Sequence, residues 1–569
     1  MHRLSGLFRS TRSTHPGQYF CSTVAMGGLS NLPSVSGEHM LNYAPGCPER
    51  AALKKALSKM KTECPEIPCV IGGREIFTGA VKTQVMPSRH SHAVCTFHEA
   101  NEDLIRSAIE NSRQAKKVWE LTPFEDRSAI FLKAAELMAL KFRPRLCAAV
   151  MLGTGKNVWQ AEIDAAAEAV DFLRFAPTMA QEVYALQPVA HSKGVWNRQV
   201  HRPLEGFVAA ISPFNFCAIG VNLPSTPAIM GNVALWKPAS TSVLGNYITF
   251  QILREAGLPD GVINFLPCSG QTFGDTALTH PDLAGVHFTG STGVFHKIWN
   301  LVSENISRYV SYPRLVGETG GKNFHFVHSS ADVSNVVHNT IRGAFEYQGQ
   351  KCSACSRLYV PSNLWPEIKQ KLLQEISQIK MGQPDTFDVF MTAVIDQKSY
   401  NNAKSYIDYA RESDDYEILI GGDCDDSEGY FVSPTLIETT NPSGKLMREE
   451  IFAPVLTVFV YPEDEYIETL ELCSHTSPFG LTGAIFAKDR YAVRQAMLSL
   501  KNAAGNFYIN DKCTGAVVGE QPFGGARKSG TNDKAGSVAN YYRWVSSQTI
   551  KETYSGLEDW KYPHMEQEI

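Results

Sequence analysis

From residue 206 the chain repeats one pattern, in which a short apolar strand is followed by a polar turn and a helix. The strands read GFVAAIS, NVALWKP, GVINFLP and AGVHFTG. A helical stretch from Gly245 to Ala256, closed by Gly257 and Pro259, separates the second strand from the third. Strand, helix, strand repetition predicts a parallel sheet with right-handed crossovers. The predicted fold class is therefore α/β.

A second α/β half begins near residue 320. It contains the strand NFHFVH, a helix over residues 364–379 and the strand-and-turn region NAAGNFYINDKCTG. Two halves of similar size predict a cleft between them. In parallel sheets ligands bind at the carboxyl ends of the strands. In the first half those ends carry Ser212 to Asn215, Lys237-Pro238 and Thr289 to Ser291.

Before the first α/β half, apolar residues recur every three or four positions over residues 101–142 and 158–175, which predicts amphipathic helices. The second stretch also carries Glu162, Asp164, Glu168 and Asp171, which we interpret as a solvated face. Residues 183–204 alternate around Ser192 to Gly194, which predicts a hairpin. The tail at 543–554 alternates as well. Exposed strands without a sheet of their own predict pairing with another subunit.

Composition excludes several classes of protein. With 53 basic and 58 acidic residues, the net charge of −5 offers no broad positive field for nucleic acid. No apolar run reaches the length of a membrane span, because Pro213, Pro224 and Pro227 interrupt the most apolar region. Thirteen cysteines without a repeating spacing predict free thiols and no structural disulfide.

The first 37 residues contain no acidic side chain but carry Arg3, Arg9, Arg12 and many serines. This composition is typical of a mitochondrial transit peptide, so we predict residues 1–37 to be a cleaved or disordered leader and the mitochondrial matrix to be the destination. A merely flexible N-terminus is the alternative.

The segment FEYQGQKCSACSRLYV, residues 345–360, carries the candidate nucleophile Cys352. Gly349 allows a tight turn before it, and the small residues after it leave peptide N–H groups accessible beside the sulfur. The alternative is a buried cysteine that only packs. Cys352 and Cys355 also form a C-x-x-C, which elsewhere is a redox pair or half of a metal site. No second pair of cysteines exists at zinc spacing, so no metal site is predicted.

Other candidates stand in turns after strands. Glu318, in a glycine-rich turn, is placed to act as a base, although a turn carboxylate bonded to nearby N–H groups is the alternative. Asn215 is placed to donate a hydrogen bond to a developing negative charge. Lys237 can reach a ribose hydroxyl or a phosphate, and Gly290-Ser291 resembles a phosphate-binding turn. The usual dinucleotide fingerprint of spaced glycines is absent.

Together, the motifs PFNF, LWKPAS, FTGS, GETGGKN, GQKCSA, EEIFAPV and PFGGARKSG, in this order, resemble the aldehyde dehydrogenase superfamily. The resemblance implies a Rossmann-type NAD-binding domain (38–179 and 206–320) and an α/β catalytic domain (321–522). It also implies a β-hairpin oligomerisation arm with a C-terminal tail (180–205 and 523–569), and hence a homodimer.

The resemblance also implies roles for individual residues. Cys352 would attack an aldehyde, Asn215 and the Cys352 N–H would hold the oxyanion, and Glu318 would activate the water that hydrolyses the thioester. The residues implied for NAD are Ser212, Lys237, Gly290, Ser291 and Glu450. The residues implied for the substrate are Glu168, Phe216, Ser353, Gly515, Ala516 and Phe523.

Within the superfamily, GQKCSACSRLYVP and INDKCTGAVVGEQPFGGARKSGTNDK are similar to the branch that acts on an amino-acid semialdehyde. This similarity implies NAD-dependent oxidation of L-glutamate γ-semialdehyde to L-glutamate in proline catabolism. Three alternatives stay open: a dehydrogenase for another semialdehyde such as succinate semialdehyde, a thiol-dependent ester hydrolase, and a non-catalytic scaffold.

Overall fold

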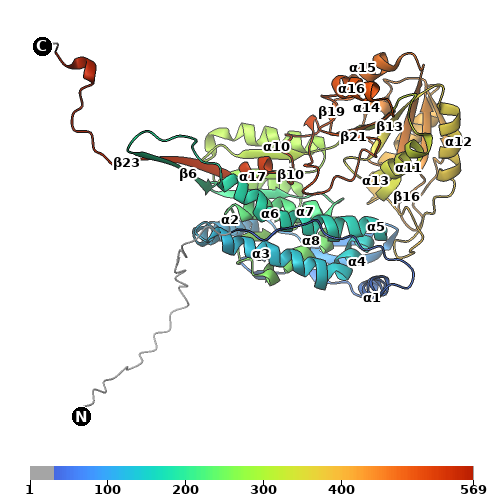
Figure 1. Ribbon diagram of the computed structural model, residues 1–569. Coiled ribbons are helices and arrows are strands. Elements are labelled where there is room, and N and C mark those ends of the chain that lie inside the picture. The colour runs from blue at the N-terminus through green and yellow to red at the C-terminus, as the bar shows by residue number, and fades with distance from the viewer. Residues whose placement is uncertain (1–30, 568–569) are drawn as a thin grey trace.

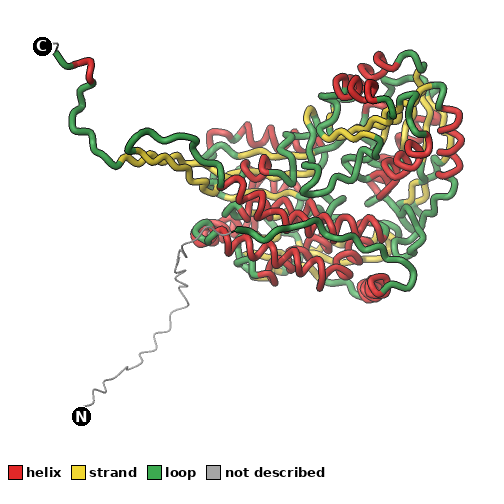
Figure 2. Tube along the Cα trace, viewed as in Figure 1, coloured by secondary structure: helices red, strands yellow, loops and turns green. Residues whose placement is uncertain are grey.

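The computed structural model describes residues 31–567, so most of the predicted transit peptide, residues 1–30, lies outside the described residues. Two seven-stranded sheets organise the fold, one in each lobe of Figure 1, with helices covering both. Both are mainly parallel, each with an antiparallel edge, which confirms the predicted α/β class. Figure 2 shows the strands enclosed between helices in both lobes.

The first sheet is built from the strands predicted after residue 206, together with an N-terminal hairpin. Its order is β11 (Arg314–Glu318), β10 (Leu283–Thr289), β7 (Phe207–Ile211), β8 (Ala234–Lys237), β9 (Ile263–Phe265), β2 (Cys69–Ile71) and β3 (Arg74–Ile76). The strands β7 to β11 run parallel, and their buried residues form one core with the flanking helices.

The second sheet begins with β12, five residues after β11 ends. Its order is β14 (Tyr416–Ile420), β17 (Thr435–Thr439), β18 (Val455–Tyr461), β13 (Cys355–Pro361), β12 (Asn323–Val327), β20 (Thr482–Phe486) and β21 (Asn506–Ile509). Separate apolar clusters pack on its faces. A third, smaller sheet pairs β1 (Glu66–Ile67) and β4 (Val81–Met86) with β5 (Arg89–His98).

The predicted helices are present, with small differences in their bounds. The helical stretch predicted over residues 158–175 continues to Tyr184, whereas the helix predicted over residues 364–379 is shorter and spans Trp365–Ile376. In the first lobe the helices are α2 (Glu102–Trp119), α3 (Phe124–Leu137), α4 (Arg143–Thr154), α5 (Val158–Ala161), η2 (Glu162–Glu168), α6 (Ala169–Tyr184), α7 (Cys217–Ile229), α8 (Val243–Ala256) and α10 (Thr292–Glu304). The main helices of the second lobe are α11 (Val333–Phe345), α12 (Trp365–Ile376), α13 (Gln397–Glu412), α15 (Tyr466–Thr476) and α16 (Arg490–Ser499).

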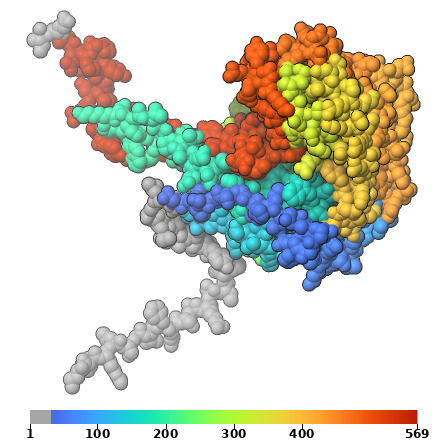
Figure 3. Space-filling model, turned by 45° about the vertical axis from the view of Figure 1, so that its right-hand side comes forward, coloured from blue at the N-terminus to red at the C-terminus, as the bar shows by residue number. Residues whose placement is uncertain are grey.

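The hairpin predicted over residues 183–204 is wrong. The helix α6 continues to Tyr184, and the only strand of that segment is β6 (Val195–Pro203). Its partner is the tail strand β23 (Val545–Thr553), in an antiparallel pair with a register from Val195 opposite Thr553 to Pro203 opposite Val545. The segment before β6 contains Pro188, which cannot donate to a ladder. Figure 3 shows this two-stranded arm projecting from the body of the molecule.

Two other expectations from the sequence can be compared with the structure. All cysteines in residues 31–567 are free, so no structural disulfide forms within that part of the chain. Over the same residues, no helix is both long enough and apolar enough to cross a membrane.

Candidate active site

The carboxyl ends of four parallel strands meet where the sequence predicts a ligand site. Thr289 at the end of β10 pairs in register with Glu318 at the end of β11, and Ile211 of β7 pairs with Lys237 of β8. The turns that follow carry Asn215 and Gly290. Their proximity is a direct result of the parallel register, because parallel strands end at one edge of the sheet.

The loop that carries Cys352 has an unusual backbone. Three consecutive residues, Tyr347, Gln348 and Gly349, have positive φ angles of 52°, 56° and 66°. A Cβ on Gly349 would lie 2.4 Å from the carbonyl oxygen of Ala453, so this position requires glycine. The Gln348 side chain holds the turn by donating to the carbonyl oxygens of Gly155 and Ala393, at 2.9 and 2.8 Å. The sharp turn is followed by Cys352, three residues before β13 begins at Cys355.

The structure brings Cys352 and Glu318 together. The thiol donates a hydrogen bond to Oε1 of Glu318 at 3.5 Å. Burial raises the pKa of Glu318 to about 7, although the thiol and Lys534 both lower it. Burial and the neighbouring Glu318 also raise the pKa of the Cys352 thiol. A carboxyl with a pKa near neutrality beside a thiol is suited to receive the thiol's proton at the moment of attack.

Asn215 lies on the other side of the loop. Its Nδ2 donates to the carbonyl oxygen of Gln350 at 3.2 Å, two residues before Cys352, and its side chain is buried. An amide nitrogen carries two N–H groups, so one remains to stabilise an oxyanion at the sulfur-bound carbon. This geometry supports the predicted role of Asn215.

We expect Asn215→Ala to lower kcat by about 10² to 10³, the usual cost of losing one oxyanion donor. Cofactor affinity should be unchanged, which fluorescence titration measures. The alkylation rate of Cys352 by iodoacetamide serves as the control for an intact loop. An equal loss of cofactor affinity would show that Asn215 supports the fold and not the transition state.

The acidic residues of the helical stretch 158–175 are not a solvated face, and that interpretation is wrong. Glu162, Asp164 and Asp171 are buried. The carboxylate of Asp164 forms an ion pair with Lys156 at 2.7 Å and accepts the N–H groups of Cys217 and Ala218 at 3.0 and 2.8 Å. It therefore caps α7, the helix that begins directly after the Asn215 turn.

Lys156 occupies the centre of this arrangement. Its ammonium lies 4.1 Å from the ring centroid of Phe216 and 4.5 Å from that of Tyr347. Burial lowers the pKa of Lys156, while Asp164 raises it. Sequence reasoning did not single out Lys156. The structure shows that this lysine joins the Asn215 turn to the Cys352 loop.

Asp164→Ala should destabilise the fold by about 3 to 5 kcal/mol, because it leaves the buried Lys156 charge without its partner and removes the cap of α7. Urea unfolding measures this change. Asp388→Ala, which removes an exposed ion pair with Lys380, is the control and should leave the midpoint unchanged. Equal midpoints for the two variants would contradict the anchoring role.

The residues implied for the substrate's amino-acid end lie beside the thiol. Ser353 follows Cys352, and its Oγ is 2.7 Å from Oγ1 of Thr514. The N–H groups of Gly515 and Ala516 form no hydrogen bond with any residue between 31 and 567. A hydroxyl next to two free N–H groups is a suitable receptor for a carboxylate. Sequence reasoning missed Thr514.

The other three substrate candidates are placed as follows. Phe216 lies over Lys156 at the start of α7, and Phe523 bridges to Ala535 through paired backbone hydrogen bonds. Burial and the nearby Asp164 raise the pKa of Glu168 to about 8, while Lys156 and Lys351 lower it. A substrate ammonium would favour the ionised form of Glu168, which agrees with its predicted role.

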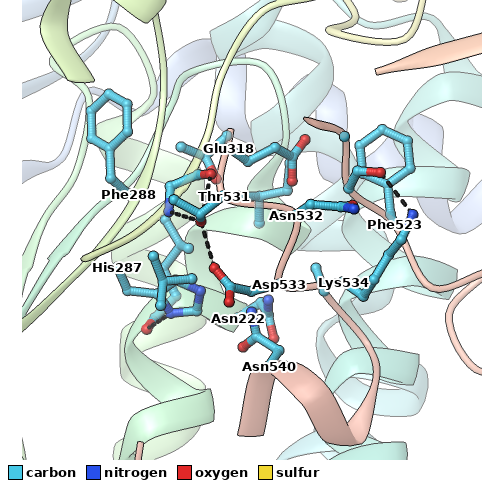
Figure 4. A pocket seen from close by; sticks show the side chains of 18 of the residues that line it. Asn222, His287, Phe288, Glu318, Phe523, Thr531, Asn532, Asp533, Lys534 and Asn540 are labelled. Carbon is cyan, nitrogen blue, oxygen red and sulfur yellow. Dashed lines mark hydrogen bonds between the residues drawn. The ribbon is translucent and has the colours of Figure 1, made fainter. Parts of the chain in front are cut away.

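A small cavity opens on the Glu318 side of the site. Glu318 and Phe523 line it, and neither Cys352 nor Ser353 does. Its other walls come from β10, α7 and the loop of residues 531–535 (Figure 4). Thr531 fixes this loop to β11, since its Oγ1 accepts the N–H of Gly317 at 3.0 Å. Lys534 lies nearby and donates to the carbonyl oxygens of Gly505 and Gly524 at 2.8 Å. The motif that ends in TNDK includes most of this loop, but no residue of the loop was assigned a role from the sequence.

The residues implied for the cofactor suit a dinucleotide. Lys237 is 8% exposed, and its Nζ donates one bond, to the carbonyl oxygen of Pro238 at 3.1 Å, which leaves donors for ribose hydroxyls. Oε1 of Glu450 accepts the N–H of Gly321 at 2.9 Å, and burial raises the pKa of Glu450 to about 7. A Cβ on Gly320 would lie 1.9 Å from Oε2 of Glu450, so a side chain at this position would displace the Glu450 carboxylate.

The phosphate side is formed by the start of α10. Ser291 stands at its N-cap and makes no side-chain cap bond. Thr292 Oγ1 is buried and has no hydrogen-bond partner within residues 31–567. Free donors at a helix N-terminus suit a pyrophosphate. The Ser212 hydroxyl is hydrogen-bonded within the fold, since its Oγ accepts Trp236 Nε1 at 3.0 Å and donates to the carbonyl oxygen of Lys237 at 3.5 Å. The assignment of Ser212 to the cofactor stays a prediction.

Comparisons with known proteins agree with this geometry. Residues 79–550 match the aldehyde dehydrogenase family. The mitochondrial delta-1-pyrroline-5-carboxylate dehydrogenase of Dictyostelium discoideum is 56% identical over 538 residues, which cover 94% of this chain and 96% of that protein. The mitochondrial enzyme of the same name from Homo sapiens is 53% identical, with 94% of each chain covered.

A solved structure is also similar throughout. The delta-pyrroline-5-carboxylate dehydrogenase of Mycobacterium tuberculosis, bound with NAD, superimposes with a TM-score of 0.92 at 44% identity. The match covers 95% of this chain and all of that one. With the thiol, carboxylate and amide assembled at the strand ends and a family match over most of its length, this chain belongs to the aldehyde dehydrogenase family.

Proposed function

We propose that the protein catalyses the NAD-dependent oxidation of L-glutamate γ-semialdehyde to L-glutamate, a step of proline catabolism. The observation that carries this proposal is the position of Ser353. Ser353 follows Cys352 in the catalytic loop, and its Oγ lies 2.7 Å from Oγ1 of Thr514 in the Thr514–Ala516 receptor. The amino-acid end of a substrate can therefore bind at Ser353 while its aldehyde lies beside the Cys352 thiol. Relatives at 50–56% identity carry the matching enzyme name.

The chain's own groups support a covalent route. Cys352 transfers its proton to Glu318, and the sulfur attacks the aldehyde carbon, forming a hemithioacetal whose oxyanion accepts hydrogen bonds from Asn215 and the Cys352 N–H. NAD, when bound at Lys237, Glu450 and the start of α10, supplies the hydride acceptor. Loss of the hydride leaves a thioester on Cys352. Glu318 passes the thiol's proton to the solvent and then receives a proton from water, and the hydroxide formed attacks the thioester and releases L-glutamate and the Cys352 thiolate.

Comparing two aldehydes tests the substrate assignment. Reduction of NAD should be faster, by kcat/KM, with L-glutamate γ-semialdehyde than with succinate semialdehyde, which lacks the amino group. The difference should shrink in Glu168→Gln, because its carboxylate faces the ammonium in this account. Preference of the wild-type enzyme for succinate semialdehyde would contradict the assignment.

A homodimer formed through the β6–β23 arm is the assembly that we propose. The arm and the following tail expose large apolar side chains, with Trp196 at 47%, Leu557 at 88% and Trp560 at 72% exposure. An isolated two-stranded arm with apolar residues in water is typical of an interface between subunits. Mass measurement of the native particle distinguishes a dimer from a monomer.

The mitochondrial matrix is the proposed location. The N-terminal composition supports it, and relatives from several organisms carry the word mitochondrial in their names.

We also propose that the first sheet and its helices form the NAD-binding domain, residues 38–179 and 206–320, and that the second sheet forms the catalytic domain, residues 321–522. The proposed arm and tail comprise residues 180–205 and 523–569.

A further inference from the structure

A histidine and two cysteines converge behind the substrate receptor, outside the catalytic machinery. His325 belongs to β12, Cys355 begins β13, and Cys513 lies in the loop after β21. A ring nitrogen of His325 and the two sulfur atoms all lie within 4.8 Å of one another. The three side chains are at most 1% exposed. Nothing in the proposed reaction uses them.

The hydrogen bonds of His325 fix its protonation state. Nε2 lies 3.0 Å from the backbone nitrogen of Cys513, which is a donor, so Nε2 carries a lone pair. Nδ1 therefore holds the proton and lies 3.0 Å from Oγ1 of Thr340. The hydrogen bond between Nδ1 and Thr340 orients the ring so that Nε2 can bind a metal ion. Coordination through Nε2 replaces its hydrogen bond from the Cys513 N–H.

Metal binding must compete with protonation at both sulfur atoms. Burial and the neighbouring Cys513 raise the pKa of Cys355. A divalent cation favours loss of both thiol protons, because metal–sulfur bonds form with the thiolate.

We propose that His325, Cys355 and Cys513 form a binding site for a thiophilic divalent cation, represented by Zn²⁺, and that occupancy of this site weakens substrate binding. Coordination forms two metal–sulfur bonds and one metal–nitrogen bond, and the two thiol protons leave to the solvent. Two thiolates neutralise the cation's charge, which suits a buried site. The effect on substrate rests on the function proposed above, whereas the binding itself does not.

The geometry needs only a small adjustment. Tetrahedral zinc with bonds of about 2.0 to 2.3 Å sets its ligand atoms about 3.5 to 3.8 Å apart. Cys513 can move toward the other two, because it lies in a loop without regular secondary structure. The fourth position is left to water or to the carbonyl oxygen of Ser353, which is 3.3 Å from Cys513 Sγ.

The same contact couples the site to the receptor. The Cys513 thiol donates to the carbonyl oxygen of Ser353, and the next residue, Thr514, bonds the Ser353 hydroxyl at 2.7 Å. Metal binding removes the thiol's proton and with it this hydrogen bond. It also draws Cys513 toward β12 and β13. Thr514, Gly515 and Ala516 follow directly in the chain, so the carboxylate receptor is displaced.

Cobalt binding tests the site without using activity. Cys352→Ala protein, which lacks the catalytic thiol, is titrated with Co²⁺ to detect thiolate-to-cobalt charge-transfer absorption, and Zn²⁺ is then added as competitor. We expect one ion per chain, with the bands lost in Cys352→Ala/Cys513→Ser and Cys352→Ala/Cys355→Ser. Cys352→Ala/Cys473→Ser, altered at a buried cysteine of another core cluster, should keep them. Absence of the bands from Cys352→Ala, or their persistence without Cys513, would overturn the proposal.

A kinetic comparison tests the coupling. Zn²⁺ at concentrations that displace Co²⁺ should raise the KM for L-glutamate γ-semialdehyde in the wild type by about 5-fold or more, a typical coupling between two sites. The KM of Cys513→Ser should not respond, and His325→Gln provides a second variant if the serine protein does not fold. An equal response of wild type and variants would overturn the coupling. Failure of the semialdehyde as substrate would leave the cobalt result standing, so the two proposals are tested separately.

Discussion

Cys352→Ala should lower kcat/KM for aldehyde oxidation by at least about 10⁴, the scale seen when an enzyme loses its nucleophile. Without the sulfur no hemithioacetal forms, and the hydride has no activated donor. Affinity for NAD should stay unchanged, because Lys237, Glu450 and α10 lie on other elements. Reduced nicotinamide absorbance measures the rate, and calorimetric titration measures the affinity.

Cys473→Ala is the matched control for this variant. Cys473 is a free and fully buried cysteine in a different apolar cluster, so its loss tests general effects of removing a core thiol. We expect the control to keep wild-type activity within a small factor. An active Cys352→Ala enzyme would exclude the covalent route.

Glu318→Gln should separate the two halves of the reaction. Turnover should fall by about 10² to 10⁴, the usual contribution of a general base. The first equivalent of NADH should still form as a burst, although more slowly than in the wild type, because Cys352 must then lose its proton to water instead of Glu318. Glutamine keeps the size of the side chain but cannot accept the water's proton. Stopped-flow absorbance resolves the burst from the slow steady state. Loss of the burst together with turnover would show that Glu318 is needed chiefly for thiol attack and not for hydrolysis of the thioester.

The dependence of the wild-type kcat on pH should reflect the ionisation of Glu318. Because burial raises the pKa of Glu318 to about 7, the carboxylate that acts as base is present only above this pH, so kcat should rise as the pH increases through 7. Glu450 has a pKa of about 7 for the same reason. Glu450→Gln should therefore keep the rise of kcat near pH 7, and Glu318→Gln should lose this rise. Loss of the rise in Glu450→Gln, with its retention in Glu318→Gln, would assign the pH dependence to the cofactor site.

The order of strands and helices along the sequence is enough to predict the parallel sheet and the position of the site at its edge. The alternation of strands and helices after residue 206 gives the parallel sheet, and the strand ends then bring Asn215, Lys237 and Glu318 to one edge. Cys352 was ambiguous from its own segment, and only the joint pattern of motifs identified it. The contact with Glu318 spans 34 residues of sequence, which no local pattern records.

The incorrect predictions concern residues whose partners in the structure are distant in the sequence. The carboxylates of residues 162–171 resemble a solvated face until Arg143 and Lys156 are placed against them. The β6 strand resembles half of a local hairpin, whereas its partner lies 342 or more residues later, at Val545–Thr553. The same limit hid the cluster of His325 and Cys513, which are 188 residues apart.

The central claim is that aldehyde oxidation proceeds through an acyl group on Cys352. Glu318→Gln enzyme is mixed with NAD and L-glutamate γ-semialdehyde, quenched in acid during the burst, and analysed by intact mass and peptide mapping. The account predicts one added glutamyl group per active site, attached to the peptide that contains Cys352, in an amount equal to the NADH formed. NADH formation without an adduct, or an adduct on another residue, would contradict it.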